Sequence, residues 1–272
     1  MLSNTPTYLQ GIRALGDLAS GKRNALATVD PRAQILATLA FILAVVSFDR
    51  YAIAGLLPLF LFPVVLAVLG DVPLRQLCRK LLIASPFAVM VGLFNPLFDQ
   101  TPVIALFGNS ISGGWVSFAS ILLRFSLTVA AALILVSTTG FQNLCHGLMR
   151  LGVPRVFVTQ LLFLHRYSVV LGSEAARMSL ARELRSSDKR SIPLKVYASL
   201  LGHLLLRALE RAQRLHWAML SRGFAGQIRV LQPLHWRTSD SVFLAISLAG
   251  ILVARQTDLV HTLGTLIVGD MR

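Results

Sequence analysis

The chain has 272 residues, of which 55% are hydrophobic and only 14% are charged. Soluble domains contain about 25% charged residues, so this chain has too few polar side chains to cover a water-exposed surface. This composition excludes disordered, collagen-like, coiled-coil and disulfide-stapled proteins and indicates an integral membrane protein. The 26 basic residues exceed the 12 acidic ones by 14. Such a surface suits anionic lipid, nucleic acid or an acidic protein partner.

Charge-poor stretches long enough to cross or nearly cross a hydrocarbon layer of about 30 Å recur along the chain. We predict five membrane spans, at 33–48, 51–70, 81–98, 115–137 and 241–255. Pro86 and Pro96 predict a kinked or tilted third span. The segment 95–114 contains no Lys or Arg and is predicted to be a loop outside the cell. Segments 13–32, 75–80 and 150–237 are basic and are therefore predicted to lie in the cytoplasm.

The predicted fold is an all-α integral membrane protein with about five transmembrane helices and two long cytoplasmic amphipathic helices. It divides into a cytoplasmic N-terminal segment (1–32), membrane helices with their loops (33–171), cytoplasmic coupling helices (172–232), and a C-terminal membrane helix and tail (233–272). The N-terminus lacks the pattern of a secretory signal peptide.

Region 172–237 contains ten Arg, two Lys and only four acidic residues. Within it, apolar side chains recur every three or four residues and predict an amphipathic helix that ends at Gly223. These apolar positions are Tyr197, Leu201, Leu204, Ala208, Leu215 and Met219. A second helical stretch is predicted from Ser173 to Arg185.

Three kinds of binding partner are considered for this basic region: anionic lipid, nucleic acid and an acidic cytoplasmic protein. Nucleic acid is disfavoured because aromatic residues do not interleave with the basic ones. Lipid electrostatics would be served about equally well by lysine, whereas the planar guanidinium of arginine binds carboxylates in a bidentate manner. The excess of Arg over Lys therefore favours a protein groove, and lipid remains the alternative.

The sequence predicts no catalytic residues, no metal site and no cofactor. Gly16–Lys22 reads G-x-x-x-x-G-K, but Arg23 stands where a phosphate-binding loop needs Ser or Thr. The six histidines do not have metal-site spacing, and Cys78 and Cys145 are predicted to be small core residues. The chain is thus not expected to be an enzyme, and any ATP hydrolysis is expected on another polypeptide.

Arg124 is the one charge inside the predicted span 115–137. A charge near the middle of a span costs at least about 2.5–3.5 kcal/mol and usually faces the bundle interior. We expect Arg124 to make a structural polar contact within the membrane. The alternative is a shifted span from which Arg124 reaches the interface.

Several segments together resemble the CbiQ-type transmembrane subunit of energy-coupling factor (ECF) transporters, also called the T component or EcfT. Their order and spacing, rather than any one motif, make the resemblance. The segments are DPRAQILATLAF (30–41), NPLFD (95–99), LLRFSLTVAAALILVSTT (122–139), LGVPRVFV (151–158), EAARMSLARELRS (174–186) and ERAQRLHWAMLSRGF (210–224).

The resemblance implies a non-catalytic scaffold that transmits ATPase motion to a substrate-binding subunit. Family members end two coupling helices in Ala-Arg-Gly-type signatures whose arginines enter grooves of two cytoplasmic ATPase subunits. Here the second signature is Ser221-Arg222-Gly223. The first is Leu184-Arg185-Ser186, and Arg182, on the same helical face, competes with Arg185 for the role.

The partners that the resemblance implies are two CbiO-like ATPase subunits, a CbiM-like substrate-binding membrane subunit and a small CbiN-like subunit, besides membrane lipid. The implied location is the bacterial cytoplasmic (inner) membrane. Cobalt is the favoured cargo, with nickel or a vitamin as alternatives. A stand-alone membrane protein whose basic helices bind anionic lipid is the competing hypothesis from another class.

Overall fold

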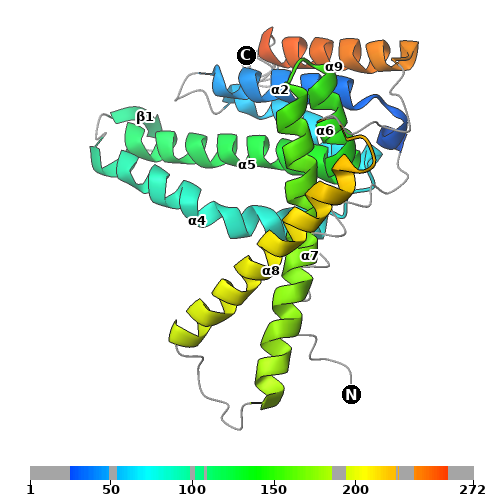
Figure 1. Ribbon diagram of the computed structural model, residues 1–272. Coiled ribbons are helices and arrows are strands. Elements are labelled where there is room, and N and C mark those ends of the chain that lie inside the picture. The colour runs from blue at the N-terminus through cyan, green and yellow to red at the C-terminus, as the bar shows by residue number, and fades with distance from the viewer. Residues whose placement is uncertain are drawn as a thin grey trace, which may run out of the picture. The chain divides into compact units, whose positions relative to one another are not determined.

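The structure, a computed structural model, describes residues 25–48, 54–98, 102–106, 109–185, 194–224, 226 and 236–256. These residues are almost all helical (Figure 1). The helices are α2 (Pro31–Val46), α3 (Leu61–Leu69), α4 (Leu74–Phe98), α5 (Gly113–Thr139), α6 (Phe141–Arg150), α7 (Arg155–Arg185), α8 (Leu194–Leu220) and α9 (Thr238–Gln256). Short 3₁₀ turns occur at Ala25–Thr28 (η1), Ala54–Leu56 (η2) and Pro58–Phe60 (η3).

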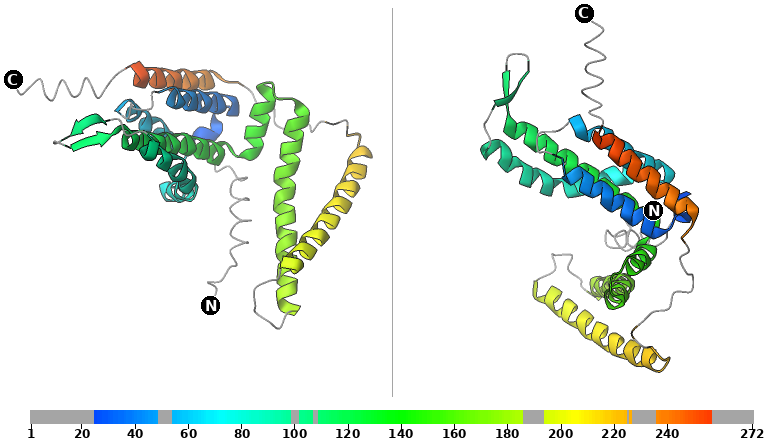
Figure 2. Two further views of the ribbon diagram at one scale, coloured as in Figure 1. Left: turned by 90° about the vertical axis from the view of Figure 1, so that its left-hand side faces the viewer. Right: turned by 90° about the horizontal axis from the view of Figure 1, so that it is seen from above.

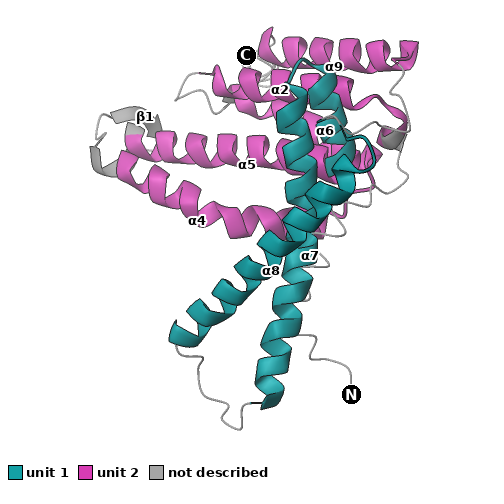
Figure 3. Cartoon of the chain, in the orientation of Figure 1, with its two compact units in different colours: residues 1–20, 141–233 teal, residues 21–140, 234–272 magenta. Residues whose placement is uncertain are grey.

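The chain forms two compact units (Figure 3). One comprises residues 21–140 and 234–272, and we call it the membrane unit. The other comprises residues 1–20 and 141–233 and contains α6, α7 and α8; we call it the basic unit.

In the membrane unit, α2 packs between α5 and α9, and α4 packs along α5 (Figure 2). Phe41 and Val45 of α2, Leu127 and Ala131 of α5, and Ile251 of α9 form its core. Phe41 also stacks on Phe62, with their ring centroids 4.4 Å apart. The outer faces stay apolar and exposed, as a lipid-facing bundle requires. For example, Leu82, Ile83 and Phe87 of α4 are each more than 70% exposed.

Buried polar contacts hold the helix ends of this unit. Asp30 is the N-cap of α2, and its carboxylate accepts the backbone N–H of Arg32 at 2.9 Å. The side-chain amide of Gln34 donates to the carbonyl of Leu26 at 2.5 Å, and the hydroxyl of Thr139 donates to the Gln34 amide oxygen. The first of these two bonds joins α2 to η1, and the second joins the start of α2 to the end of α5.

Four helices in the described part of the chain are long and apolar enough to cross a membrane: Leu74–Asn95, Gly114–Thr139, Arg155–Arg185 and Thr238–Gln256. The all-α membrane fold is thus confirmed, and the predicted spans 115–137 and 241–255 match α5 and α9. The span predicted at 81–98 belongs to a longer helix that begins at Leu74, and α4 continues through Pro86 and Pro96.

Two predicted spans differ from the structure. The span predicted at 33–48 corresponds to α2, which has 16 residues, and that at 51–70 is divided into η2, η3 and the nine-residue α3. Gly55 and Pro58 interrupt regular helix in this stretch, because proline lacks an N–H donor and glycine has low helix propensity. Pro63 lies in the first turn of α3, where proline is tolerated. In addition, α7 has the length and composition of a span, although its charges had predicted a cytoplasmic segment.

The segment 95–114, predicted as a loop, contains an antiparallel hairpin of β1 (Pro102–Leu106) and β2 (Asn109–Ser112). Val103 and Ile104 are β-branched, which favours strand. The sequence argument used only the absence of basic residues and missed this local preference.

Candidate partner-binding site on the basic helices

The basic unit is built around a long helix pair. The stretch predicted at 173–185 is helical, but it is the C-terminal part of the 31-residue α7 rather than a separate helix. The predicted amphipathic helix is confirmed as α8, which has 27 residues. The two helices cross obliquely (Figures 1 and 2). At about 1.5 Å per residue they are roughly 46 Å and 40 Å long.

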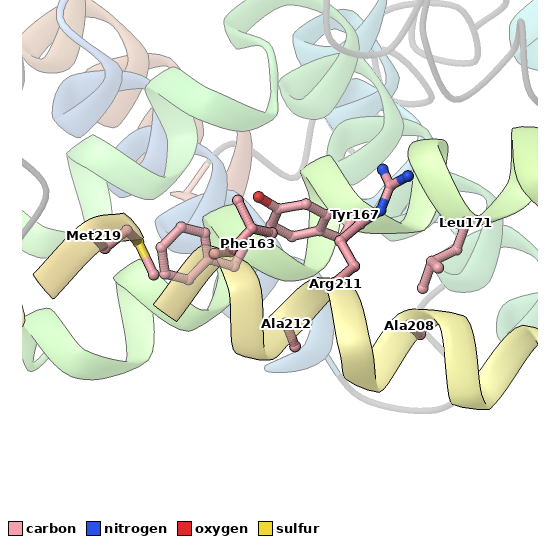
Figure 4. Close-up of a pocket in the computed structure, with 8 residues that line it drawn as sticks. Phe163, Tyr167, Leu171, Ala208, Arg211, Ala212 and Met219 are labelled. Atoms are coloured by element: carbon pink, nitrogen blue, oxygen red, sulfur yellow. The ribbon is translucent and has the colours of Figure 1, made fainter. Parts of the chain in front are cut away.

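Apolar stripes of α7 and α8 meet at the crossing. Phe163, Tyr167 and Leu171 follow one another at four-residue spacing on α7. Across from them lie residues of α8, among them Ala208, Ala212 and Met219 (Figure 4). Figure 4 shows Met219 beside Phe163 and Ala208 beside Leu171, so the helices run antiparallel. These residues, with Arg211 and Leu215, line a cavity of about 270 Å³.

An ion pair lies next to these stripes. The carboxylate of Glu174 on α7 accepts a hydrogen bond from Nη1 of Arg207 on α8 at 2.6 Å. Its second oxygen accepts one from Nη2 of Arg177, one turn further along α7, also at 2.6 Å. Both carboxylate oxygens of Glu174 are therefore engaged, one within α7 and one across the pair.

The C-terminus of α8 has a defined cap. The N–H of Gly223 donates to the carbonyl of Leu220, and the N–H of Phe224 donates to the carbonyl of Met219, each at 3.0 Å. Gly223 has φ +76°, the left-handed conformation that glycine adopts without strain. This is the Schellman motif, with Arg222 at the C-cap and Gly223 just after it. The helix end predicted at Gly223 is confirmed, and Ser221, Arg222 and Gly223 are all exposed.

The C-terminus of α7 is Arg185 itself, which is exposed, and Leu184 beside it is 81% exposed. Ser186, the third residue of the predicted signature, lies outside the described residues. Arg182 is half-buried, one turn before the end. Within the described part of the chain, Arg182, Arg185 and Arg222 make no ion pair.

The structure does not bring the two arginine signatures together. Because the helices are antiparallel, Arg185 and Arg222 lie on opposite sides of the Glu174–Arg207 contact. Arg185 lies eleven residues beyond Glu174, or about 16 Å of helix, and Arg222 lies fifteen residues beyond Arg207, or about 22 Å.

Arg124 belongs to the membrane unit. It lies in α5, two residues from the helix midpoint, and its side chain is half-buried. Its carbonyl accepts the hydroxyl of Thr128 at 2.8 Å. The helix bounds leave about eleven residues on one side of Arg124 and fifteen on the other, so the side chain starts deep within the predicted span.

The described residues contain no cluster of three or more His, Cys, Asp or Glu that could hold a metal. Of the cysteines, Cys145 is buried in α6, as predicted, but Cys78 is exposed on α4, so the prediction of a core position was wrong for it. Burial raises the pKa of the Cys145 thiol and lowers the pKa of His146, so neither is charged near neutral pH. A protonated, buried thiol is a poor nucleophile.

Sequence reasoning missed the Glu174–Arg207 contact and the Phe163–Leu171 stripe. The four-residue spacing of Phe163, Tyr167 and Leu171 is a helical signal that a periodicity count over 155–172 would have found. The ion pair joins residues 33 positions apart, and no local pattern indicates such a partner.

Comparison with known proteins gives a consistent result. Residues 22–233 match the family model CbiQ, described as cobalt transport protein. An uncharacterized protein of Methanocaldococcus jannaschii is 27% identical over 78% of this chain and 81% of its own length. The cobalt transport protein CbiQ of Rhodobacter capsulatus is 32% identical over 50% of this chain. The nickel permease LarQ of Lactiplantibacillus plantarum is 33% identical over 48% of it. The chain spans 58% and 47% of these last two proteins.

Proposed function

Since the chain belongs to the CbiQ cobalt transport protein family, we propose that it is the transmembrane coupling subunit of an ATP-driven, ECF-type metal-ion importer. In this role it hydrolyses nothing itself. It transmits the motion of two cytoplasmic ATPase subunits to a separate membrane subunit that captures the substrate.

The observation that carries the proposal is the pair of exposed arginines at helix ends. Arg185 closes α7 and Arg222 caps α8, and neither has an ion-pair partner among the described residues. A guanidinium binds carboxylates in a planar, bidentate manner, so each tip suits an acidic groove on a partner. A long helix transmits a displacement of its tip to its other end, because its hydrogen-bonded backbone is stiff along the axis.

The proposal requires α7 and α8 to lie on the water side of the membrane. α8 is not among the candidate spans, and it is highly charged, with Arg207, Glu210, Arg211 and Arg214 on successive turns. The middle of α7 packs against α8 through Phe163, Tyr167 and Leu171. Packing of its central face against a charged, non-spanning helix supports a position of α7 outside the hydrocarbon, since buried charges there are costly. The length and composition of α7 are therefore not sufficient to identify it as a membrane span.

The basic character of these helices favours the cytoplasmic side by the positive-inside rule. The protein would then be a multi-pass component of the bacterial cytoplasmic membrane. Between the two candidate anchors of the first signature, Arg185 is exposed at the helix end whereas Arg182 is half-buried. This exposure favours Arg185 as the residue that enters the partner groove.

The cargo is proposed to be a cobalt ion. The family description and the relative named cobalt transport protein favour it, and the relative named nickel permease keeps nickel as the alternative. The specificity-determining ligands are expected on the CbiM-like membrane subunit, with a small CbiN-like subunit as a further candidate, because the described residues lack a metal-binding cluster.

Co-purification tests the proposal. The chain, expressed together with the proteins encoded beside its gene and extracted in mild detergent, is expected to retain an ATPase subunit. The double variant Arg185→Ala/Arg222→Ala is expected to insert normally and to lose that subunit. A chain that binds anionic-lipid vesicles but retains no ATPase would favour the lipid-binding alternative and would contradict the coupling role.

A further inference from the structure

We propose that the Glu174–Arg207 ion pair is a brace that fixes α7 and α8 to one another at their crossing, so that the two arginine tips move together. Glu174 and Arg207 are thus positioning residues that act through the helices rather than on any bound molecule. This inference rests on the proposed coupling function, because it assigns the element that joins the two arms.

The pair lies near the middle of both helices, with the Arg207 side chain 59% exposed. Arg207 is the central residue of α8, and Glu174 lies four residues past the centre of α7. The Glu174 side chain is 20% exposed, and its two oxygens accept from Arg207 and Arg177, both at 2.6 Å. The Arg177 bond lies within α7, whereas the Arg207 bond joins Glu174 to α8.

The packing beside the pair explains why a brace is needed. The α8 face at the crossing presents small side chains, Ala208 and Ala212, and a cavity of about 270 Å³ remains between the helices. Loose apolar packing is non-directional, so it leaves rotation and sliding of one helix on the other weakly specified. A hydrogen-bonded ion pair has defined distances and angles. It fixes the crossing although exposed ion pairs contribute little to overall stability.

The position of the pair determines its mechanical effect. Arg185 and Arg222 lie beyond it on opposite arms, about 16 Å and 22 Å along the helices. A contact at the crossing therefore decides whether displacement of one tip rotates the other arm or only slides one helix past its neighbour. With the Glu174–Arg207 ion pair intact, α7 and α8 move as one rigid body. Without it, the two helices move independently.

Distance measurement between spin labels tests the brace directly. Labels are placed at Ala181, on the half of α7 that carries Arg185, and at Ala198, on the half of α8 that precedes Arg207. Both positions are exposed, and Cys78 and Cys145 are replaced by alanine in the labelled chain. In the purified full-length protein with Glu174 and Arg207 unchanged, the two spin labels are expected to give one narrow distance distribution. Arg207→Gln is expected to broaden it at least twofold, and Glu174→Gln is expected to do the same.

Arg177→Gln is the matched control. It removes a hydrogen bond of the same length to the same carboxylate, but that bond lies within α7. This variant is expected to leave the distribution narrow. An unchanged distribution in Arg207→Gln, or equal broadening in Arg177→Gln, would overturn the brace. Normal elution in size-exclusion chromatography checks that each variant is folded.

A second readout separates the brace from the proposed function. In the complex with ATPase subunits, Arg207→Gln is expected to keep the subunits bound but to lower transport per ATP hydrolysed at least threefold, whereas Arg177→Gln retains it. Loss of the coupling ratio in Arg207→Gln alone supports the brace, and an unchanged ratio overturns it. If the wild-type chain binds no ATPase, the coupling function fails, while the label distances still decide whether the brace exists.

Discussion

The backbone N–H of Asp30 donates a hydrogen bond to the carboxylate of Asp240, 210 residues further along the chain, at 2.9 Å. The other oxygen of Asp240 accepts the N–H of Arg237 at 2.7 Å, just before α9 begins. Asp240 is 1% exposed and Asp30 is 5% exposed. One buried carboxylate therefore joins the N-termini of α2 and α9, where the helix dipoles favour negative charge.

We expect Asp240→Ala to destabilise the membrane unit, because the buried N–H of Asp30 and the part-buried N–H of Arg237 lose their acceptor. A buried N–H group costs about 1–3 kcal/mol when left unsatisfied. Thermal unfolding in detergent is expected to show a lower midpoint for Asp240→Ala and a smaller decrease for Asp240→Asn, which keeps one acceptor oxygen. Ser239→Ala, at the exposed neighbouring position, is the control. An unchanged midpoint in Asp240→Ala would show that this contact does not stabilise the frame.

The arginine tips give the main functional prediction. Arg222→Ala is expected to weaken retention of the ATPase subunit at least tenfold, and Arg185→Ala/Arg222→Ala to abolish it, because each substitution removes a group that binds carboxylates in a bidentate manner. Retention is measured by pull-down of the solubilised complex. Arg214→Ala is the matched control, since Arg214 is exposed on the same helix and has only a distant 3.9 Å contact with Glu210.

The choice between Arg182 and Arg185 is decided by the same assay. Arg185 is exposed at the helix end, so Arg185→Ala is expected to weaken ATPase retention more than Arg182→Ala does. The reverse order would move the first signature to Ala181-Arg182-Glu183.

The cap of α8 is predicted to matter independently of the arginine. Gly223→Ala places a Cβ in a left-handed conformation, which costs about 1–2 kcal/mol, although nothing lies within 4 Å of the added atom. We expect this variant to fray the last turn and to lower ATPase retention with Arg222 present. Gly223→Asn is expected to retain more binding, because asparagine tolerates this conformation. Equal retention by all three proteins would show that the cap does not position Arg222.

Arg124 is expected to act within the membrane unit. If it makes a polar contact inside the bundle, Arg124→Ala lowers assembly or metal uptake and Arg124→Lys, which keeps the charge, restores part of it. Uptake of radioactive cobalt into vesicles measures this effect. Full assembly and uptake in Arg124→Ala would indicate that the side chain only extends to the membrane interface.

Features with a local chemical cause could be predicted from the sequence. The amphipathic period of α8 and its end at Gly223 follow from side-chain spacing and from the conformational freedom of glycine. The apolar runs of α5 and α9 likewise identify these helices. In each case the residues that determine the structure are neighbours along the chain.

Features that depend on distant residues could not be predicted. The Glu174–Arg207 contact and the Asp30–Asp240 hydrogen bond each join helices through the tertiary fold, and nothing near these residues specifies the partner. The division of 51–70 into short helices was missed for a different reason. The absence of charge in this stretch predicted one long span, and the breaks that Gly55 and Pro58 introduce were not taken into account.

Site-specific photo-crosslinking tests the central claim most directly. A photoreactive amino acid is placed at Leu184 or at Ser221, each next to an arginine tip. The control position is Leu201, which is exposed in the N-terminal half of α8. In membranes containing the whole transporter, irradiation is expected to attach the ATPase subunit to the chain from Leu184 and from Ser221 but not from Leu201. Absence of an ATPase adduct from both tips, in a complex that still transports its ion, would contradict the account.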